Sequence, residues 1–278
     1  MKKIKLAFTL AVTSLLICCN QSQKESFNIL LIGNSSIYFN NMPKMLEFIA
    51  SENGFRLKTK LLAYGGYTLQ DHLNDGRIVQ ILNSMDWDFV VLNEQSTLGE
   101  NYSINGFPRV RESFSFYNSV REFDSLIRKT GAQTIIISLY PRKNAPKQDG
   151  LMLDYSYMKI ARELKILLAP VSETWKAVSN ERTGWELYRE DNLHPTPLGS
   201  YITASVLFST ITKKKSKPLD KEIFGPLIED FDGFVQKDSI VSLINMDTSK
   251  SRFISGIVFK NIEKLNEAGG YFHIEKPK

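Results

Sequence analysis

Short apolar runs alternate with amphipathic segments between residues 27 and 212, and this order restricts the possible folds more than any other feature of the chain. The runs are FNILLIG (27–33), RLKTKLLA (56–63), WDFVVLN (87–93), QTIIISLY (133–140) and ILLAPV (166–171). A short continuous apolar run that ends in glycine, like the first, is typical of a strand buried on both faces of a parallel sheet. We therefore expect about five parallel strands.

The segments between these runs carry apolar side chains at helical spacing. The clearest faces are Met42, Met45, Leu46 and Ile49, with Pro43 in the first turn and Gly54 at the end, and Phe116, Val120, Phe123 and Ile127, followed by Gly131. Further helices are predicted around 68–83, from Ser172 onward, and from Thr196 to about Thr212. This alternation predicts a three-layer, doubly wound α/β fold with a parallel sheet between two layers of helices.

The region after Pro218 is harder to interpret. Its apolar residues, for example FISGIVF (253–259), are compatible with an edge strand plus a helix. No segment rich in Gly, Pro or Ser separates it from the preceding helix. We therefore expect residues 215–278 to be a small C-terminal appendage of one domain that spans residues 27–278.

The first twenty residues, MKKIKLAFTLAVTSLLICCN, have the pattern of an export signal: a lysine-rich start and a short apolar stretch. The end of this stretch resembles a bacterial lipobox, and Cys19 fits the acylated position better than Cys18, which follows the bulky Ile17. We predict a lipoprotein signal peptide over 1–18, a lipid on Cys19, a polar tether over 19–26, and a location in the cell envelope, periplasmic or at the outer membrane. A plain secretory signal or an N-terminal anchor helix is the alternative.

Composition excludes several other classes of protein. With 42% hydrophobic and 23% charged residues, the chain resembles a soluble globular domain and not a disordered or multi-span membrane protein. Removing Lys2, Lys3 and Lys5 with the signal reduces the 35 basic residues to 32 against 30 acidic ones, a net charge of +2. This balance gives no electrostatic support for binding a nucleic acid.

Both cysteines precede the predicted domain, so the domain has no internal disulfide and no thiolate nucleophile or zinc–thiolate site. The three histidines, His72, His194 and His273, are far apart in sequence and form no His-Glu-x-x-His motif, so we expect no metal and no cofactor.

Polar residues follow several of the predicted strands, where ligands bind in open parallel sheets. They include Ser35 after the first strand, Gly66 after the second and Asn93 after the third, while Asp191 and His194 precede the last helix. A serine ester hydrolase needs a hydroxyl nucleophile, an imidazole base, a carboxylate that orients the base, and donors for the oxyanion. These positions supply each group. Taken alone, Gly-Asn-Ser is also compatible with an ordinary turn, and Asp-x-x-His with a helix cap.

The order of these motifs resembles the SGNH, or GDSL-type, hydrolase superfamily over roughly residues 27–212. Gly-Asn-Ser stands in place of the usual Gly-Asp-Ser and is similar to a subgroup in which an aromatic residue and Asn-Asn-Met/Leu-Pro follow, as in IYFNNMP (37–43). The resemblance implies Ser35 as nucleophile, His194 as base, Asp191 as its partner, and the N–H groups of Ser35 and Gly66 with Asn93 as oxyanion donors. The third block reads LNEQS instead of Gly-x-Asn-Asp, so Gln95 is the alternative to Asn93. The Gly-x-Ser-x-Gly motif of the α/β-hydrolases is absent.

Several aromatic and polar residues near these motifs are candidates for substrate contacts. They are Tyr67, Gln95, Trp185 and Tyr188, although core packing explains Trp185 and Tyr188 equally well. His72 and His273 are expected to be structural or surface residues.

The sequence therefore predicts an exported serine esterase that acts through an acyl-enzyme, and the resemblance favours O-acetyl groups on carbohydrate as its substrate. One alternative is a surface glycan-binding lipoprotein without catalytic activity. Another is an acyltransferase with the same triad.

Overall fold

A computed structural model describes residues 25–228, 235–271 and 273–277 of the chain. The predicted signal peptide, Cys19 and most of the predicted tether lie outside the described residues. The first strand begins at Ser26, one residue earlier than expected.

The central sheet has five parallel strands in the order β2-β1-β3-β6-β7. Their bounds are β1 Ser26–Gly33, β2 Arg56–Ala63, β3 Phe89–Leu92, β6 Gln133–Ile137 and β7 Leu167–Ala169. The predicted doubly wound parallel sheet is thus confirmed. The strand order reverses at β1, which lies between β2 and β3, and ligands bind at such a switch point outside the carboxyl ends of the strands.

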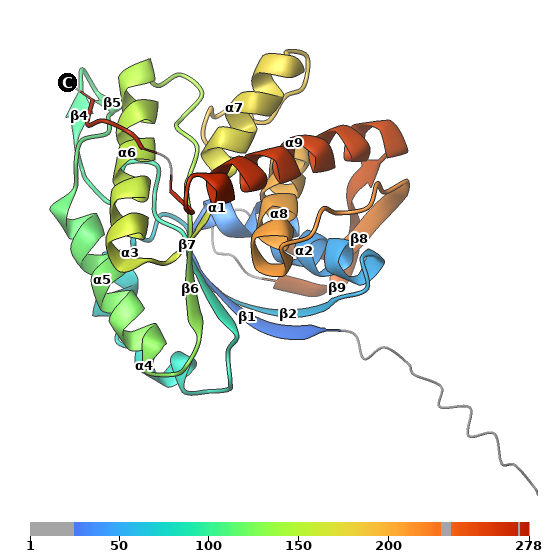
Figure 1. Cartoon of the computed structure of the whole chain (residues 1–278), viewed down its shortest axis with the longest axis horizontal. Helices are drawn as coiled ribbons and strands as arrows, with labels where there is room; N and C mark the ends of the chain where they lie inside the picture. Colours follow the sequence, from blue (N-terminus) through green and yellow to red (C-terminus); the bar gives the residue numbers. More distant parts are fainter. Residues whose placement is uncertain (1–24, 229–234, 272, 278) are drawn as a thin grey trace, which may run out of the picture.

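Helices cover both faces of the sheet (Figure 1). One layer, with the helices that pack on it, comprises α1 Ser35–Tyr38, a 3-10 turn at Phe39–Asn41, α2 Met42–Glu52, α7 Val171–Glu181, α8 Pro197–Thr212 and α9 Thr248–Glu267. The opposite layer comprises α3 Leu69–Asn74, α4 Ile78–Leu82, α5 Phe114–Arg128 and α6 Lys147–Leu164. A short hairpin, β4 Ser103–Ile104 and β5 Phe107–Pro108, precedes α5.

Helix α8 is buried along nearly its whole length because α2, α7 and α9 all pack against it. Its sequence is correspondingly apolar or small on every side, as expected of a helix without a solvent face. The side chain of Thr196 caps its N-terminus by accepting a hydrogen bond from the N–H of Gly199. This cap fixes the point at which the chain enters the helix directly after His194.

Two predicted helices differ in detail from the structure, and one helix was missed. The segment 68–83 forms two short helices, because the chain turns at Gly76, which has a φ of +75°. Helix α7 begins at Val171, and the Ser172 hydroxyl does not cap it but donates to Asp154 at 2.9 Å. The long helix α6 was not predicted, because polar residues interrupt its apolar spacing.

The C-terminal region contains a helix, as the sequence allowed, but its strands do not join the edge of the central sheet. Strands β8 Lys221–Ile228 and β9 Val235–Met246 form a separate antiparallel hairpin, and FISGIVF lies within α9. Helix α9 packs on α7 and α8, and Asn41, next to α2, donates from Nδ2 to the carbonyl of Pro226 in β8 at 2.7 Å. The region is therefore packed against the helix layer that carries the residues after Ser35.

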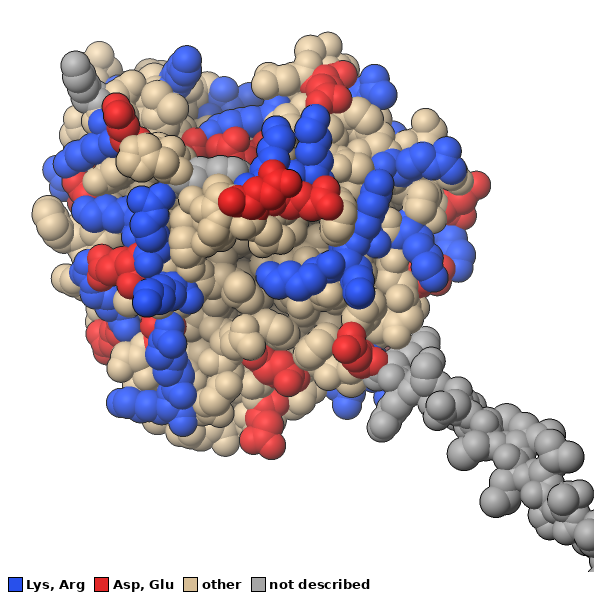
Figure 2. Space-filling view, in the orientation of Figure 1, with Lys and Arg blue, Asp and Glu red and all other residues tan. Residues whose placement is uncertain are grey.

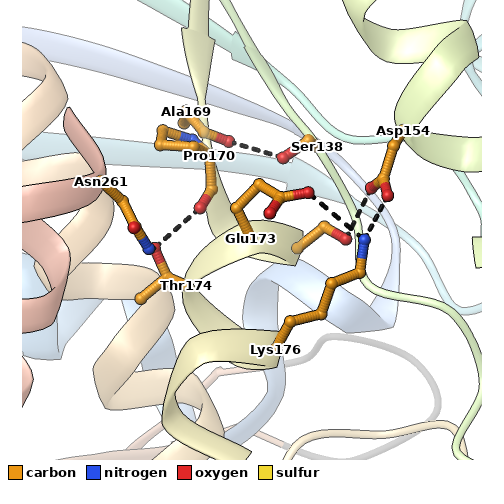
Figure 3. Close-up of polar contacts among 9 residues, drawn as sticks. Ser138, Asp154, Ala169, Pro170, Glu173, Thr174, Lys176 and Asn261 are labelled. Atoms are coloured by element: carbon orange, nitrogen blue, oxygen red, sulfur yellow. Dashed lines mark hydrogen bonds and ion pairs between the residues drawn. The ribbon is translucent and has the colours of Figure 1, made fainter. Parts of the chain in front are cut away.

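A network of polar contacts joins α7 to α6 and to α9 near the carboxyl ends of β6 and β7 (Figure 3). Asp154 of α6 is buried and pairs with Lys176 of α7, which also contacts Glu173 at 3.3 Å. Asn261 of α9 donates to Thr174 of α7 at 3.3 Å. The network holds α7 in place between the two neighbouring helices, and α7 leads into the loop with Asp191.

On the face of the molecule in Figure 2, basic and acidic side chains are interspersed and form no large patch of one sign. In the described part of the chain, no helix is both long and apolar enough to cross a bilayer.

Candidate active site

Ser35 is the first residue of α1, in the sharp turn that follows β1. Asn34 caps the helix: its Oδ1 accepts from the N–H and the hydroxyl of Ser36 at 3.2 and 2.8 Å. Its Nδ2 donates to the carbonyl of Tyr67 at 3.1 Å. An aspartate at this position could accept the first two hydrogen bonds but could not donate the third. The Gly-Asn-Ser sequence therefore joins the turn after β1 to the loop after β2.

The structure brings Ser35, His194 and Asp191 together, although 159 residues separate the first two. His194 Nε2 lies 2.9 Å from Ser35 Oγ, and His194 Nδ1 lies 2.6 Å from Asp191 Oδ2. With Nδ1–H donating to Asp191, Nε2 is free to accept the serine proton. These contacts have the geometry of a nucleophile, a base and an orienting carboxylate.

Asp191 is held in its ionised form by local hydrogen bonds. Its Oδ1 accepts from the backbone N–H groups of Leu193 and His194, both at 2.9 Å. Partial burial raises the pKa of Asp191, but the hydrogen bonds from the His194 ring and these two N–H groups outweigh it and lower the pKa to about 2. The carboxylate is therefore charged at any pH at which the imidazole could act as a base.

The ring of Phe39 lies flat against the imidazole of His194, with ring centroids 4.1 Å apart and an angle of 4° between the planes. The guanidinium of Arg189 lies over the same phenyl ring at 5.3 Å. Phe39 was not among the predicted site residues. It belongs to the motif IYFNNMP, but its contact with His194 depends on the tertiary fold.

Sheet register places the predicted oxyanion donors beside Ser35. Gly33 pairs with Ala63 of β2, and Ile32 pairs with Leu92 of β3, so the loops after the three strands meet. A Cβ on Gly33 would lie 2.8 Å from both the Cβ and the carbonyl oxygen of Asn93, so only glycine allows this close approach.

Asn93 is buried, and its Oδ1 has no hydrogen-bond partner among the described residues. Gly66 is exposed with a φ of +73°, and no described group accepts from its N–H. As the first residue of α1, Ser35 also has an N–H without an intrahelical acceptor. The three predicted donors therefore remain candidates for an oxyanion hole.

Gln95 and Tyr67 lie in the same loops but have structural contacts. Gln95 Nε2 donates to the carbonyl of Gly66, which joins the loops after β2 and β3. The half-buried Tyr67 ring packs at 5.1 Å from the His72 ring. Between Asn93 and Gln95, the buried Glu94 accepts from the N–H groups of Leu69 and Gln95 at 3.1 and 2.7 Å.

Two histidines are outside the triad. His72 is buried, and its Nε2 lies 2.7 Å from the carbonyl of Gly33 in the turn before Ser35. Burial lowers the pKa of His72, so the neutral ring donates from Nε2 to this carbonyl. His273 is exposed. Within residues 25–228, 235–271 and 273–277, no group of three or more His, Cys, Asp or Glu side chains could hold a metal ion.

A cavity of about 720 Å³ adjoins the triad and is lined by His194, Asp191, Phe39 and Tyr188, among others. The Tyr188 hydroxyl donates to the carbonyl of Pro141 at 2.8 Å, so Tyr188 is both a wall residue and a packing residue. Trp185 does not line this cavity and packs instead against Phe253 of α9, with ring centroids 5.4 Å apart. Of the two aromatic candidates, Tyr188 therefore lines the cavity next to the triad and Trp185 does not.

No protein-family model matches the sequence, and no curated protein matches it. Several solved structures match the fold. A DUF4886 family protein from Bacteroides uniformis has a TM-score of 0.63 at 14% identity, over 90% of this chain and 98% of its own. The acetyl xylan esterase AlAXEase has a TM-score of 0.55 at 13% identity, over 66% of this chain and 99% of its own.

The psychrotrophic esterase EstA from Pseudoalteromonas sp., in a structure inhibited by monoethylphosphonate, has a TM-score of 0.52 at 17% identity, over 67% of this chain and 97% of its own. Together with the strand order and the layers described above, these likenesses show that the chain has the α/β fold of SGNH/GDSL-type esterases and lipases.

Proposed function

We propose that the protein is a serine ester hydrolase whose nucleophile is Ser35. The contact chain from Ser35 through His194 to Asp191, with distances of 2.9 and 2.6 Å, is the observation that carries this proposal. The esterases among the structural neighbours support the same class of reaction.

In the proposed reaction, Ser35 Oγ attacks the ester carbonyl carbon while His194 Nε2 takes the hydroxyl proton. The N–H groups of Ser35 and Gly66, with Nδ2 of Asn93, stabilise the negative charge that develops on the carbonyl oxygen. The imidazolium then protonates the leaving alkoxide, and an acyl-enzyme remains. Water, deprotonated by the same His194, then attacks the acyl carbon. The imidazolium returns this proton to Ser35 Oγ as the bond between Oγ and the acyl carbon breaks, which releases the acid and free Ser35.

We propose further that the substrate is an O-acyl, and in particular an O-acetyl, ester of a carbohydrate. One structural neighbour is named as an acetyl xylan esterase. The cavity of about 720 Å³ next to His194 falls within the range of about 300–1,000 Å³ that small-molecule sites occupy.

The test is acetate release from acetylated polysaccharides and from p-nitrophenyl acetate by the purified protein, with Ser35→Ala and Ser84→Ala beside it. Ser84 is exposed and lies before β3, at the opposite end of the sheet from the site, so it controls for loss of a hydroxyl group. We expect Ser35→Ala to lose nearly all activity and fluorophosphonate labelling, and Ser84→Ala to keep both. Wild-type turnover in Ser35→Ala would refute the assignment of the nucleophile.

The proposed place of this activity is the cell envelope, where Cys19 would carry a lipid. Metabolic labelling with a radioactive fatty acid tests this: label should appear on the wild-type protein and be absent from Cys19→Ser. Equal labelling of both proteins would contradict the lipidation of Cys19.

A further inference from the structure

A second cavity lies on the other side of Asp191, between the β4–β5 hairpin and the segment after β6. Its volume is about 490 Å³, and Asp191 is one of its lining residues, so it adjoins the triad directly. Its walls include two arginines, Arg109 and Arg142. A pocket of this size, next to the reacting groups, can hold a part of the substrate beyond the ester itself.

The two arginines differ in how their charges are compensated. Arg109 is clamped to the buried Asp149: Nε lies 2.9 Å from Oδ2, and Nη2 lies 2.9 Å from Oδ1. In the described part of the chain, Arg142 makes no side-chain hydrogen bond or ion pair, and its Nε is a buried donor without a partner. Within the described ranges, Arg109 is therefore paired with a carboxylate, whereas Arg142 is not.

Arg142 is half-buried, and partial burial of a guanidinium without a partner is unfavourable, because arginine does not lose its proton. Burial lowers the pKa of Arg142, and the charge of Asp191 offsets part of this effect. Asp191 accepts from the His194 ring and two backbone N–H groups, and no hydrogen bond joins it to Arg142 among the described residues. Nε itself is buried, so an anion that enters the cavity would pair with the other N–H groups of the guanidinium, and a carboxylate is a partner that suits them.

The remaining walls of the cavity suit a sugar ring. Phe107, the first residue of β5 after the hairpin turn, is 65% exposed, so its ring is available to a ligand in the cavity. The turn that presents it, Asn105–Gly106, has φ values of +51° and +79°, as in the tight turns preferred by hairpins. Exposed amides of Asn105 and Asn144 lie in the same lining and can exchange hydrogen bonds with hydroxyl groups.

We propose that this cavity is a subsite for an acidic sugar residue, whose carboxylate pairs with Arg142 and whose apolar face lies against Phe107. The substrate would then be an ester of a carboxylate-bearing glycan. This inference rests on the proposed esterase activity and specifies its substrate class.

The experiment compares two substrates that differ only in charge: an O-acetylated oligogalacturonide and the same oligomer with its carboxylates reduced to hydroxymethyl groups. Initial rates are measured for the wild type, Arg142→Gln and the charge control Arg56→Gln, with p-nitrophenyl acetate to report on the triad in each protein. Arg56 is exposed at the start of β2, at the opposite end of the sheet from the site. Thermal unfolding of each variant checks that it folds.

We expect the wild type and Arg56→Gln to prefer the acidic oligomer. Arg142→Gln should lose about 10- to 100-fold of this preference, mainly through KM, as expected when one charged hydrogen-bonding partner is removed. If the wild type cleaves p-nitrophenyl acetate but shows no preference for the acidic oligomer, the subsite is refuted while the esterase remains. An equal loss on both oligomers in Arg142→Gln also refutes it.

If the wild type cleaves no ester at all, the proposed function fails, and the subsite is then decided by calorimetric binding of the oligogalacturonide. Binding to the wild type that is lost in Arg142→Gln would support a carboxylate site. The absence of binding to the wild type would overturn it.

Discussion

Ionisation of Glu94 should lower the stability of the fold as the pH rises. The carboxyl group is 1% exposed, and burial raises its pKa from an ordinary value of 4.5 to about 7, although the N–H groups of Gln95 and Leu69 donate to it. In the unfolded chain the group loses its proton near pH 4.5, whereas in the folded protein it keeps the proton until about pH 7. Stability is therefore full below pH 4.5 and declines as the pH rises from 4.5 to about 7.

The size of the effect follows from that interval. At about 1.4 kcal/mol per pH unit, the folded protein loses about 3 kcal/mol of its free energy of unfolding across the range. Because the group is fully buried, solvent does not screen this cost. The side chain in Glu94→Gln cannot titrate. It lacks one of the two acceptor oxygens, and the resulting loss of stability is the same at every pH.

Urea unfolding of the wild type and Glu94→Gln at a series of pH values from 5 to 8 measures the effect. The difference between the two free energies of unfolding cancels the contributions of the other titrating groups. The wild type should become progressively less stable relative to Glu94→Gln, with most of the change below pH 7. A difference between the two proteins that stays constant over this range would refute the reasoning.

Two further predictions concern the site directly. Asp191→Asn should lower kcat on p-nitrophenyl acetate about 10⁴-fold. Oδ1 of residue 191 accepts from the N–H groups of Leu193 and His194, so the NH₂ group of the asparagine would face Nδ1 of His194. Nδ1 would then accept a hydrogen bond instead of donating one, and the imidazole would hold the wrong tautomer. A kcat near that of the wild type would contradict this account. Asn93→Ala should lower kcat about 100-fold with little change in KM if Nδ2 is an oxyanion donor. An unchanged rate would assign that role to Gln95 or to backbone N–H groups alone.

The central sheet could be predicted from the sequence because its strands are buried on both faces and appear as apolar runs. The convergence of Ser35, Asn93 and His194 could be predicted for a related reason: parallel strands end at one edge of the sheet, so residues far apart in the chain meet there. Helix α6 could not be found in this way. Its buried face includes Asp149 and Asp154, which pair with cations from other elements, so polar residues stand where apolar ones were expected.

The cavity beside Asp191 could not be predicted either. Arg142 lies in a loop, where no periodicity shows which way a side chain points, and Phe107 is an exposed aromatic residue in a strand of only two residues. Trp185 is the opposite case. It lies near Asp191 and His194 in the sequence, but its ring packs against Phe253 of α9. This contact could not be predicted, because the sequence did not define the structure of the region that forms α9.

The flat contact between Phe39 and His194 joins the segment that carries the proposed nucleophile to the segment that carries the proposed base. Phe39 follows Ser35 by four residues, at the end of α1. Its ring covers one face of the imidazole of His194, which lies far from it in the sequence. The base therefore cannot rotate about its side-chain bonds without displacing this phenyl ring. A shift of α1 would therefore move Ser35 together with the ring against which His194 rests.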